Sequence, residues 1–109
     1  MKSQETLLKE MNEIVAQYLS FLSLLNDDDS LFISSNKNSE SRNEATRFIY
    51  RVFTSFMSLK DEEKEVLNKE YFHREKNGWW IKTYKKDAFL NLLYSSVSTF
   101  LRRFYGNES

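Results

Sequence analysis

The chain contains no cysteine and no proline, and among its 109 residues only two are glycine and one is histidine. Without cysteine it can form no disulfide and no thiolate site, which excludes thiol redox chemistry. The single histidine, His73, supplies too few ligands for an ordinary zinc site. Gly78 and Gly106 stand far apart, so the sequence holds no glycine-rich phosphate-binding loop. We therefore expect no metal ion and no cofactor.

Long apolar runs and isolated acidic residues are missing as well. No stretch is apolar over the length that crosses a membrane, and Met1–Glu5 leads into an acid-bearing amphipathic segment instead of a signal peptide. No Asp or Glu stands alone in an apolar run, the environment that raises a carboxyl pKa for acid–base catalysis. The sequence therefore predicts a cytoplasmic, non-enzymatic protein with neither a membrane nor a small-molecule substrate among its partners.

Charged residues are plentiful, and the two signs are unevenly divided along the chain. Residues 1–70 carry 9 Lys and Arg against 13 Asp and Glu, whereas residues 71–109 carry 7 against 3. The first part therefore has a net charge of −4 and the second a net charge of +4, which gives the formal total of zero. Any surface that binds an anion is expected in the second part.

Apolar residues recur with helical spacing, and no stretch keeps the period of two that marks a strand. The pattern predicts an all-α single domain, a compact bundle of roughly four to five helices. The helices are expected near residues 3–26, 42–57, 61–72 and 86–105. The first two form an N-terminal pair within residues 1–57, and the others belong to residues 58–109.

The first predicted helix has three apolar columns, which make a face wider than the seam of a two-stranded coiled coil. Two of the columns have heptad spacing and contain Leu8, Met11, Val15, Tyr18, Leu22 and Leu25. The third column contains Leu7, Ile14 and Phe21. Core packing against the chain's own helices is the favoured interpretation, and a homodimer interface is the alternative.

Residues 27–41 are rich in Ser, Asn and Asp and are predicted to form a polar loop, with Leu31-Phe32-Ile33 docking on the bundle. Ser41 and Glu44 have the spacing of a capping box, which places the start of the second helix. Arg47 and Arg51 lie one turn apart, on a face that is either simply solvated, as we favour, or in contact with phosphate. The face predicted to be buried contains Ala45, Phe48, Ile49, Val52, Phe53, Phe56 and Met57.

The last predicted helix is apolar around most of its circumference, which indicates neighbours on more than one side. Gly106 is expected to cap its C-terminus, Asp61 to cap the start of the third helix, and Trp79–Tyr84 to form a short helix or an irregular turn. The polar stripe of the last helix contains Asp87, Asn91, Ser95, Ser98 and Arg102. The core is predicted to contain Phe48, Val52, Phe56, Leu67, Phe89, Leu93, Val97, Phe100 and Phe104.

Residues 58–105 have the order helix, turn, short segment, turn, long helix, which is that of a helix-turn-helix unit. In such a unit, the first turns of the second helix enter the major groove of DNA. Here those turns would present Lys85, Lys86 and Asn91, because asparagine can read adenine and lysine can reach phosphate or guanine. The side chains expected to flank the groove and contact the DNA backbone are Arg74, Lys76 and Lys82.

Two segments of this half resemble known DNA-binding families. Leu59–Leu67, followed by Tyr71, resembles the entry to the promoter-reading domain of bacterial sigma factors. The last helix of the ArpU- and RinA-type phage regulators of late transcription is similar to a second set of residues, namely Trp80, Tyr84–Phe89, Ser96 and Phe100. These families share a sigma-like helix-turn-helix, so the resemblance implies duplex DNA as the partner and transcription regulation as the role.

The sequence departs from the regulators at Lys85, Asp87 and Ala88, where they usually carry Ser, Ser and Thr. Two hypotheses follow. The first is a non-enzymatic, sigma-like helix-turn-helix regulator that binds duplex DNA as a dimer. The second is a helical protein-interaction module, homo-oligomeric through the first or last helix, without nucleic-acid binding. Exposure of the basic residues on one surface favours the first, and their pairing with the acidic runs favours the second.

Overall fold

The computed structural model describes residues 3–26 and 35–106, and every regular element within them is a helix. The elements are α1 (Gln4–Asn26), α3 (Ser35–Met57), α4 (Asp61–Leu67), a π-helix η1 (Asn68–Phe72) and α5 (Lys86–Gly106). The all-α prediction is therefore confirmed for the described part of the chain. The third predicted helix has the expected extent, but it changes from α to π geometry at Asn68, where i→i−5 bonding begins.

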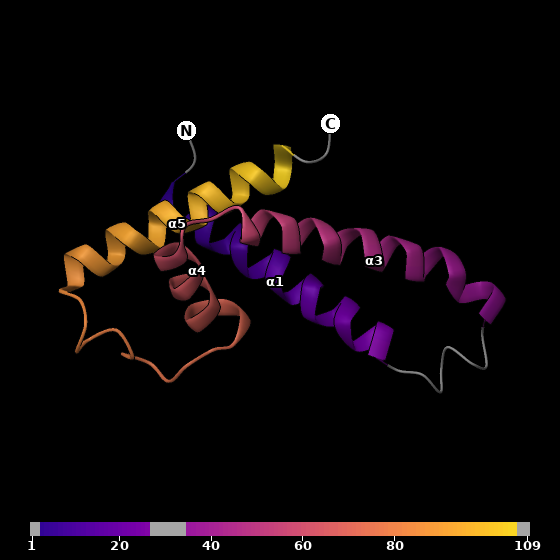
Figure 1. Cartoon of the computed structure of the whole chain (residues 1–109), viewed down its shortest axis with the longest axis horizontal. Coiled ribbons are helices and arrows are strands. Elements are labelled where there is room, and N and C mark those ends of the chain that lie inside the picture. The colour runs from indigo at the N-terminus through magenta and orange to yellow at the C-terminus, as the bar shows by residue number, and fades with distance from the viewer. Residues whose placement is uncertain (1–2, 27–34, 107–109) are drawn as a thin grey trace.

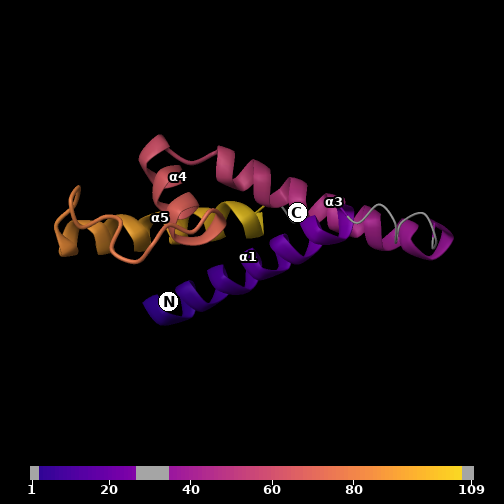
Figure 2. The same cartoon turned by 90° about the horizontal axis from the view of Figure 1, so that it is seen from below.

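α5 crosses the other helices near the middle of the molecule (Figure 1). α1 and α3 lie alongside each other in opposite directions, while α5 packs against α1, α3 and α4. In both views the first turns of α5 project beyond the other helices, together with the connection that precedes them (Figure 2). One end of the molecule is thus built almost entirely from residues that follow η1.

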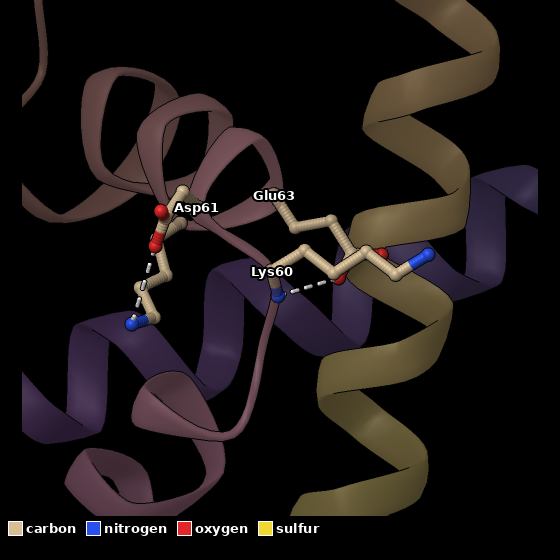
Figure 3. Close-up of polar contacts among 4 residues, drawn as sticks. Lys60, Asp61 and Glu63 are labelled. Atoms are coloured by element: carbon tan, nitrogen blue, oxygen red, sulfur yellow. Dashed lines mark hydrogen bonds and ion pairs between the residues drawn. The ribbon is translucent and has the colours of Figure 1, made fainter.

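Local hydrogen bonds explain where two of the helices begin. Ser3 caps α1, because its hydroxyl accepts a hydrogen bond from the Thr6 amide at 3.2 Å. At α4 the N-cap residue is Lys60 and not Asp61, so that prediction was off by one residue. The Glu63 carboxylate accepts from the Lys60 amide at 2.9 Å (Figure 3), which is the Glu half of a capping box. Asp61 instead lies 3.9 Å from the Lys64 ammonium.

The predicted start of the second helix was wrong, since α3 begins at Ser35 and Ser41 lies inside it. The physical reason is that residues 35–41 contain neither Pro nor Gly, so nothing in the backbone stops the helix from extending toward the N-terminus. The capping box at Ser41 therefore does not mark an end. The predicted docking of Leu31-Phe32-Ile33 lies outside the described residues.

The predicted core is confirmed, and aromatic contacts join its layers. Phe72 at the end of η1 makes edge-to-face contacts with Tyr18 at 5.4 Å and Phe56 at 5.5 Å between ring centroids. It also approaches Phe100, whose side chain is fully buried, at 6.2 Å. These contacts tie α1, α3 and α5 to the π-helix. The buried members of the predicted core are Val52, Leu67, Phe89, Leu93, Val97, Phe100 and Phe104, and Phe48 and Phe56 pack against them.

Two predictions about the ends and faces of helices need correction. Phe53 and Met57 were placed in the buried face of α3, but they are 55% and 49% exposed. They lie about 100° and 140° around the helix from Val52, beyond the sector that α1 and α5 cover. Gly106 is the last helical residue of α5 and does not adopt a positive φ, so it is not the left-handed cap that was expected.

Candidate nucleic-acid interface

The connection between η1 and α5, residues 73–85, carries most of the predicted DNA contacts, and we call it the basic loop. It contains Arg74, Lys76, Lys82 and Lys85, and Lys86 follows as the first residue of α5. The loop consists of turns and contains no helix, so Trp79–Tyr84 forms the irregular turn that was one of the two expectations. Its chain path is set by backbone bonds such as Tyr84 N–H to the Trp80 carbonyl at 2.8 Å.

Trp79 holds the middle of the basic loop against η1. Its indole N–H donates to Glu70 Oε1 at 2.7 Å, and the Lys69 ammonium lies 4.9 Å from the centroid of its ring. The ring also meets Phe89 edge to face at 5.7 Å. One side chain thus connects the loop to both flanking helices, through a charge-assisted hydrogen bond, a cation–π contact and aromatic packing.

Trp80 packs the basic loop against α5. Its ring stacks on Phe89 with the centroids 4.4 Å apart. The turn that makes this possible passes through Gly78, which has a φ of +80°. A Cβ at Gly78 would lie 2.9 Å from Ile81 Cδ1, so the turn depends on glycine both for its backbone angle and for space.

The six predicted DNA contacts, Arg74, Lys76, Lys82, Lys85, Lys86 and Asn91, are all exposed. Two ion pairs among the described residues lie elsewhere, between Lys64 and Asp61 and between Lys69 and Glu65, each at 3.9 Å. Within residues 3–26 and 35–106, none of the six forms an ion pair with an acidic side chain. The basic loop and the start of α5 lie at the same end of the molecule in both views. The five cations therefore remain accessible to an external anion.

The polar stripe predicted for the last helix is exposed along its whole length in the structure. Its members are Asp87, Asn91, Ser95, Ser98 and Arg102. The opposite side of α5 is buried, and even Ser96 on that side is fully covered, with its hydroxyl donating to the Leu92 carbonyl at 2.6 Å. Asn91 thus stands on an open face of the helix, one to two turns after the two lysines.

The connection between the two helices departs from a helix-turn-helix in its length. Such units join their helices with a turn of about three to four residues, whereas residues 73–85 separate η1 from α5. The buried face of the first turns of α5, at Phe89, is covered by Trp79, Trp80 and Tyr84 instead of by a helix. The predicted order of a helix, a connection and a long helix is present, but an aromatic loop stands where a helix-turn-helix has its tight turn.

Arg47 and Arg51 behave differently from each other. Arg47 is exposed, whereas the Arg51 guanidinium lies 4.0 Å from the centroid of the Phe104 ring. Arg51 Nε–H also donates to the Phe104 carbonyl at 3.2 Å. Arg51 therefore joins α3 to the C-terminal turns of α5, which neither of the two sequence interpretations anticipated.

Tyr71, which lies directly before Phe72 in η1, is less acidic than a free tyrosine. Burial, the neighbouring Glu70 carboxylate and Tyr94 together raise the pKa of its phenol from 10.0 to about 12, against a lowering by Arg74. The phenol thus stays neutral at the edge of the basic loop. Glu70 is the same carboxylate that accepts the hydrogen bond from Trp79.

A second surface was missed by the sequence patterns because it uses residues that were assigned to the core. It consists of Phe53 and Met57 on α3 together with a pocket of about 180 Å³ beside them, and we call it the apolar surface. The polar side chains at the pocket are Asn68 and His73, whose Oδ1 and Nδ1 atoms lie 2.7 Å apart. The pocket is lined by Tyr18, Val52, Phe53, Phe56, Met57, Asn68, Phe72 and His73.

No family model, curated protein or solved structure matches the chain. Among the described residues there is no group of three or more His, Asp or Glu side chains that could hold a metal ion. The same residues include no helix with both the length and the apolar character needed to cross a membrane.

Proposed function

We propose that the chain is a non-enzymatic, DNA-binding regulator of transcription that contacts duplex DNA with the basic loop and the first turns of α5. The observation that carries the proposal is the exposure of all six predicted contact residues at one end of the molecule. Their freedom from acidic partners within the described residues supports the same conclusion. The resemblance of residues 58–105 to sigma-like regulators supplies the class of regulator.

The roles follow from the chemistry of each side chain. Arg74, Lys76 and Lys82 contact phosphates and set the position of the protein on the duplex, without reading sequence. Lys85 and Lys86 lie where the open face of α5 begins, so they reach phosphates or guanine at the edge of the major groove. Asn91, farther along that face, is placed to read an adenine edge with its amide.

Single substitutions separate binding from sequence reading. Lys85→Ala and Lys86→Ala should each reduce the steepness of log affinity against log salt concentration by about one unit, because each variant loses one phosphate contact. Arg47→Ala is the matched control: this exposed cation on α3 lies outside the proposed interface, so the slope should not change. Asn91→Ala should keep the slope and weaken the preference among duplex sequences. Equal slopes for the wild type and both lysine variants would refute the assignment.

The apolar surface favours a second candidate function, a helical module that associates with a second copy of itself. Phe53 and Met57 project from the same surface that holds the pocket, so a two-fold axis could place Phe53 of each copy in the pocket of the other. Of the apolar side chains of α1 that would form the alternative interface, Met11, Ile14 and Val15 are buried within the chain, and Leu7, Leu8 and Tyr18 are partly buried against the same core.

Sedimentation equilibrium tests this second candidate. Phe53→Glu should convert a dimer into a monomer, because it places a charge in an apolar contact. Ile81→Glu serves as the control, since Ile81 is 65% exposed but lies in the basic loop, away from the apolar surface. A wild-type protein that remains monomeric at high concentration, or a dimer insensitive to Phe53→Glu, would argue against this interface.

A further inference from the structure

We infer that Trp79 and Glu70 form a clamp that positions the basic loop for binding, a role that rests on the proposed function. Neither residue belongs to the set predicted to touch DNA. The hydrogen bond from Trp79 Nε1 to Glu70 Oε1, at 2.7 Å, joins the middle of the loop to η1. Glu70 and Trp79 are therefore positioning residues, which act through the cations on either side of Trp79.

The position of the clamp in the loop gives it this effect. Arg74 and Lys76 precede Trp79, whereas Lys82, Lys85 and Lys86 follow it. The start of the loop is tied to η1 by the bond from the Glu75 amide to the Lys69 carbonyl at 2.9 Å, and Trp80 ties the chain just after the clamp to α5 through its stack on Phe89. Without the clamp, the chain between these two ties would lose its hydrogen bond to η1 and would keep the cation–π contact of Trp79 with Lys69. Lys76, which lies between the two ties, and Arg74 and Lys82, which lie next to them, would then have to be ordered during binding, which costs affinity.

The charge of Glu70 supports the inference. A carboxylate beside a surface that binds phosphate weakens binding through like-charge repulsion, so an acid at this position needs a compensating role. Here the carboxylate accepts the indole N–H in a partly buried contact, and Lys69 covers the same ring at 4.9 Å. The bond to a charged acceptor is stronger than one to a neutral acceptor, which suits a contact that must hold a loop.

A pair of Glu70 substitutions with equal charge isolates the hydrogen bond from the electrostatic effect. Glu70→Gln removes the charge but keeps an oxygen that can accept from Trp79, whereas Glu70→Leu removes both the charge and the acceptor. Glu70→Gln should bind a random DNA duplex at least as tightly as the wild type, because a repulsive charge is gone. Glu70→Leu should bind about fivefold more weakly than Glu70→Gln, with the same salt slope. Trp79→Phe, which keeps a ring without the donor, should be weakened in the same way.

Limited trypsin digestion measures the loop without DNA, since cleavage sites follow Arg74, Lys76, Lys82, Lys85 and Lys86. Cleavage in the loop should be about fivefold faster in Glu70→Leu and Trp79→Phe than in the wild type and Glu70→Gln. Equal cleavage rates in all four proteins would overturn the clamp. Faster cleavage combined with equal DNA affinity of the two Glu70 variants would overturn its role in binding. If the cleavage rates differ as expected but even the wild type binds no DNA, the proposed function fails while the clamp itself is supported.

Discussion

The ring of Trp80 lies flat on the ring of Phe89, with 4.4 Å between the centroids and an angle of 7° between the planes. Phe89 is the first buried residue of α5, so the helix that carries the candidate DNA contacts is covered at its start by a loop. The stack lies next to the turn at Gly78, because Trp80 comes two residues after this glycine, whose φ is +80°. The same local structure thus leaves the lysines exposed and buries Phe89.

Gly78→Ala should destabilise the protein by about 1–2 kcal/mol, because an L side chain is strained at this φ and its Cβ would lie 2.9 Å from Ile81. Gly106→Ala is the matched control, since a Cβ there meets no atom within 4 Å and the residue is helical. That change should be neutral or stabilise the protein by less than about 1 kcal/mol. Urea denaturation of both variants measures the difference, and equal stabilities would contradict the strained turn.

Phe100→Ala should cost about 3–5 kcal/mol of unfolding free energy, because the side chain is 0% exposed and lies between Phe72 and Phe104. Phe53→Ala removes the same group from a site that is 55% exposed, and should cost less than about 1 kcal/mol. Chemical denaturation measures both values, provided that the unfolding free energy depends on denaturant concentration with the same slope in each protein. A loss below about 1 kcal/mol at Phe100 would show that α5 does not form the core.

Stability should fall as the pH rises from 10 to 12, because the pKa of Tyr71 is 10.0 in the unfolded reference and about 12 in the folded protein. Between these values the unfolded phenol loses its proton while the folded phenol keeps it, which favours unfolding. Below pH 10 the contribution is fully present. Tyr71→Phe has no ionisable group at this site, so its stability should decline less over the same interval. A decline of equal size in both proteins would assign the effect to other groups.

Much of the architecture was predictable because it depends on periodic burial. The spacing of three to four residues places one set of apolar side chains on the same face of a helix, and all of them are buried as expected. The set is Phe89, Leu93, Val97, Phe100 and Phe104. Periodicity could not tell which apolar residues a neighbour would cover, and this explains the errors at Phe53 and Met57. A pattern also has no information on where a helix stops when no Pro or Gly interrupts it, as the early start of α3 at Ser35 shows.

The exposure of the candidate site's residues was predictable, but the way the chain holds them was not. Lys85, Lys86 and Asn91 were identified from their place at the start of a helix, and their exposure agrees with that assignment. The contact between Glu70 and Trp79 joins a π-helix to an irregular turn, and the spacing of residues does not indicate that these two side chains meet. Tertiary contacts between irregular segments depend on the path of the backbone, which residue spacing alone does not define.

A salt titration of wild-type binding to random duplex DNA tests the central proposal most directly. Fluorescence anisotropy at a series of salt concentrations gives the slope of log affinity against log salt. With the five cations Arg74, Lys76, Lys82, Lys85 and Lys86 all on phosphates, the slope should approach about −4.5, since each contact contributes about −0.9. If the protein shows no binding at low ionic strength, or binding that does not weaken with salt, the proposal that the basic loop and α5 bind DNA is contradicted.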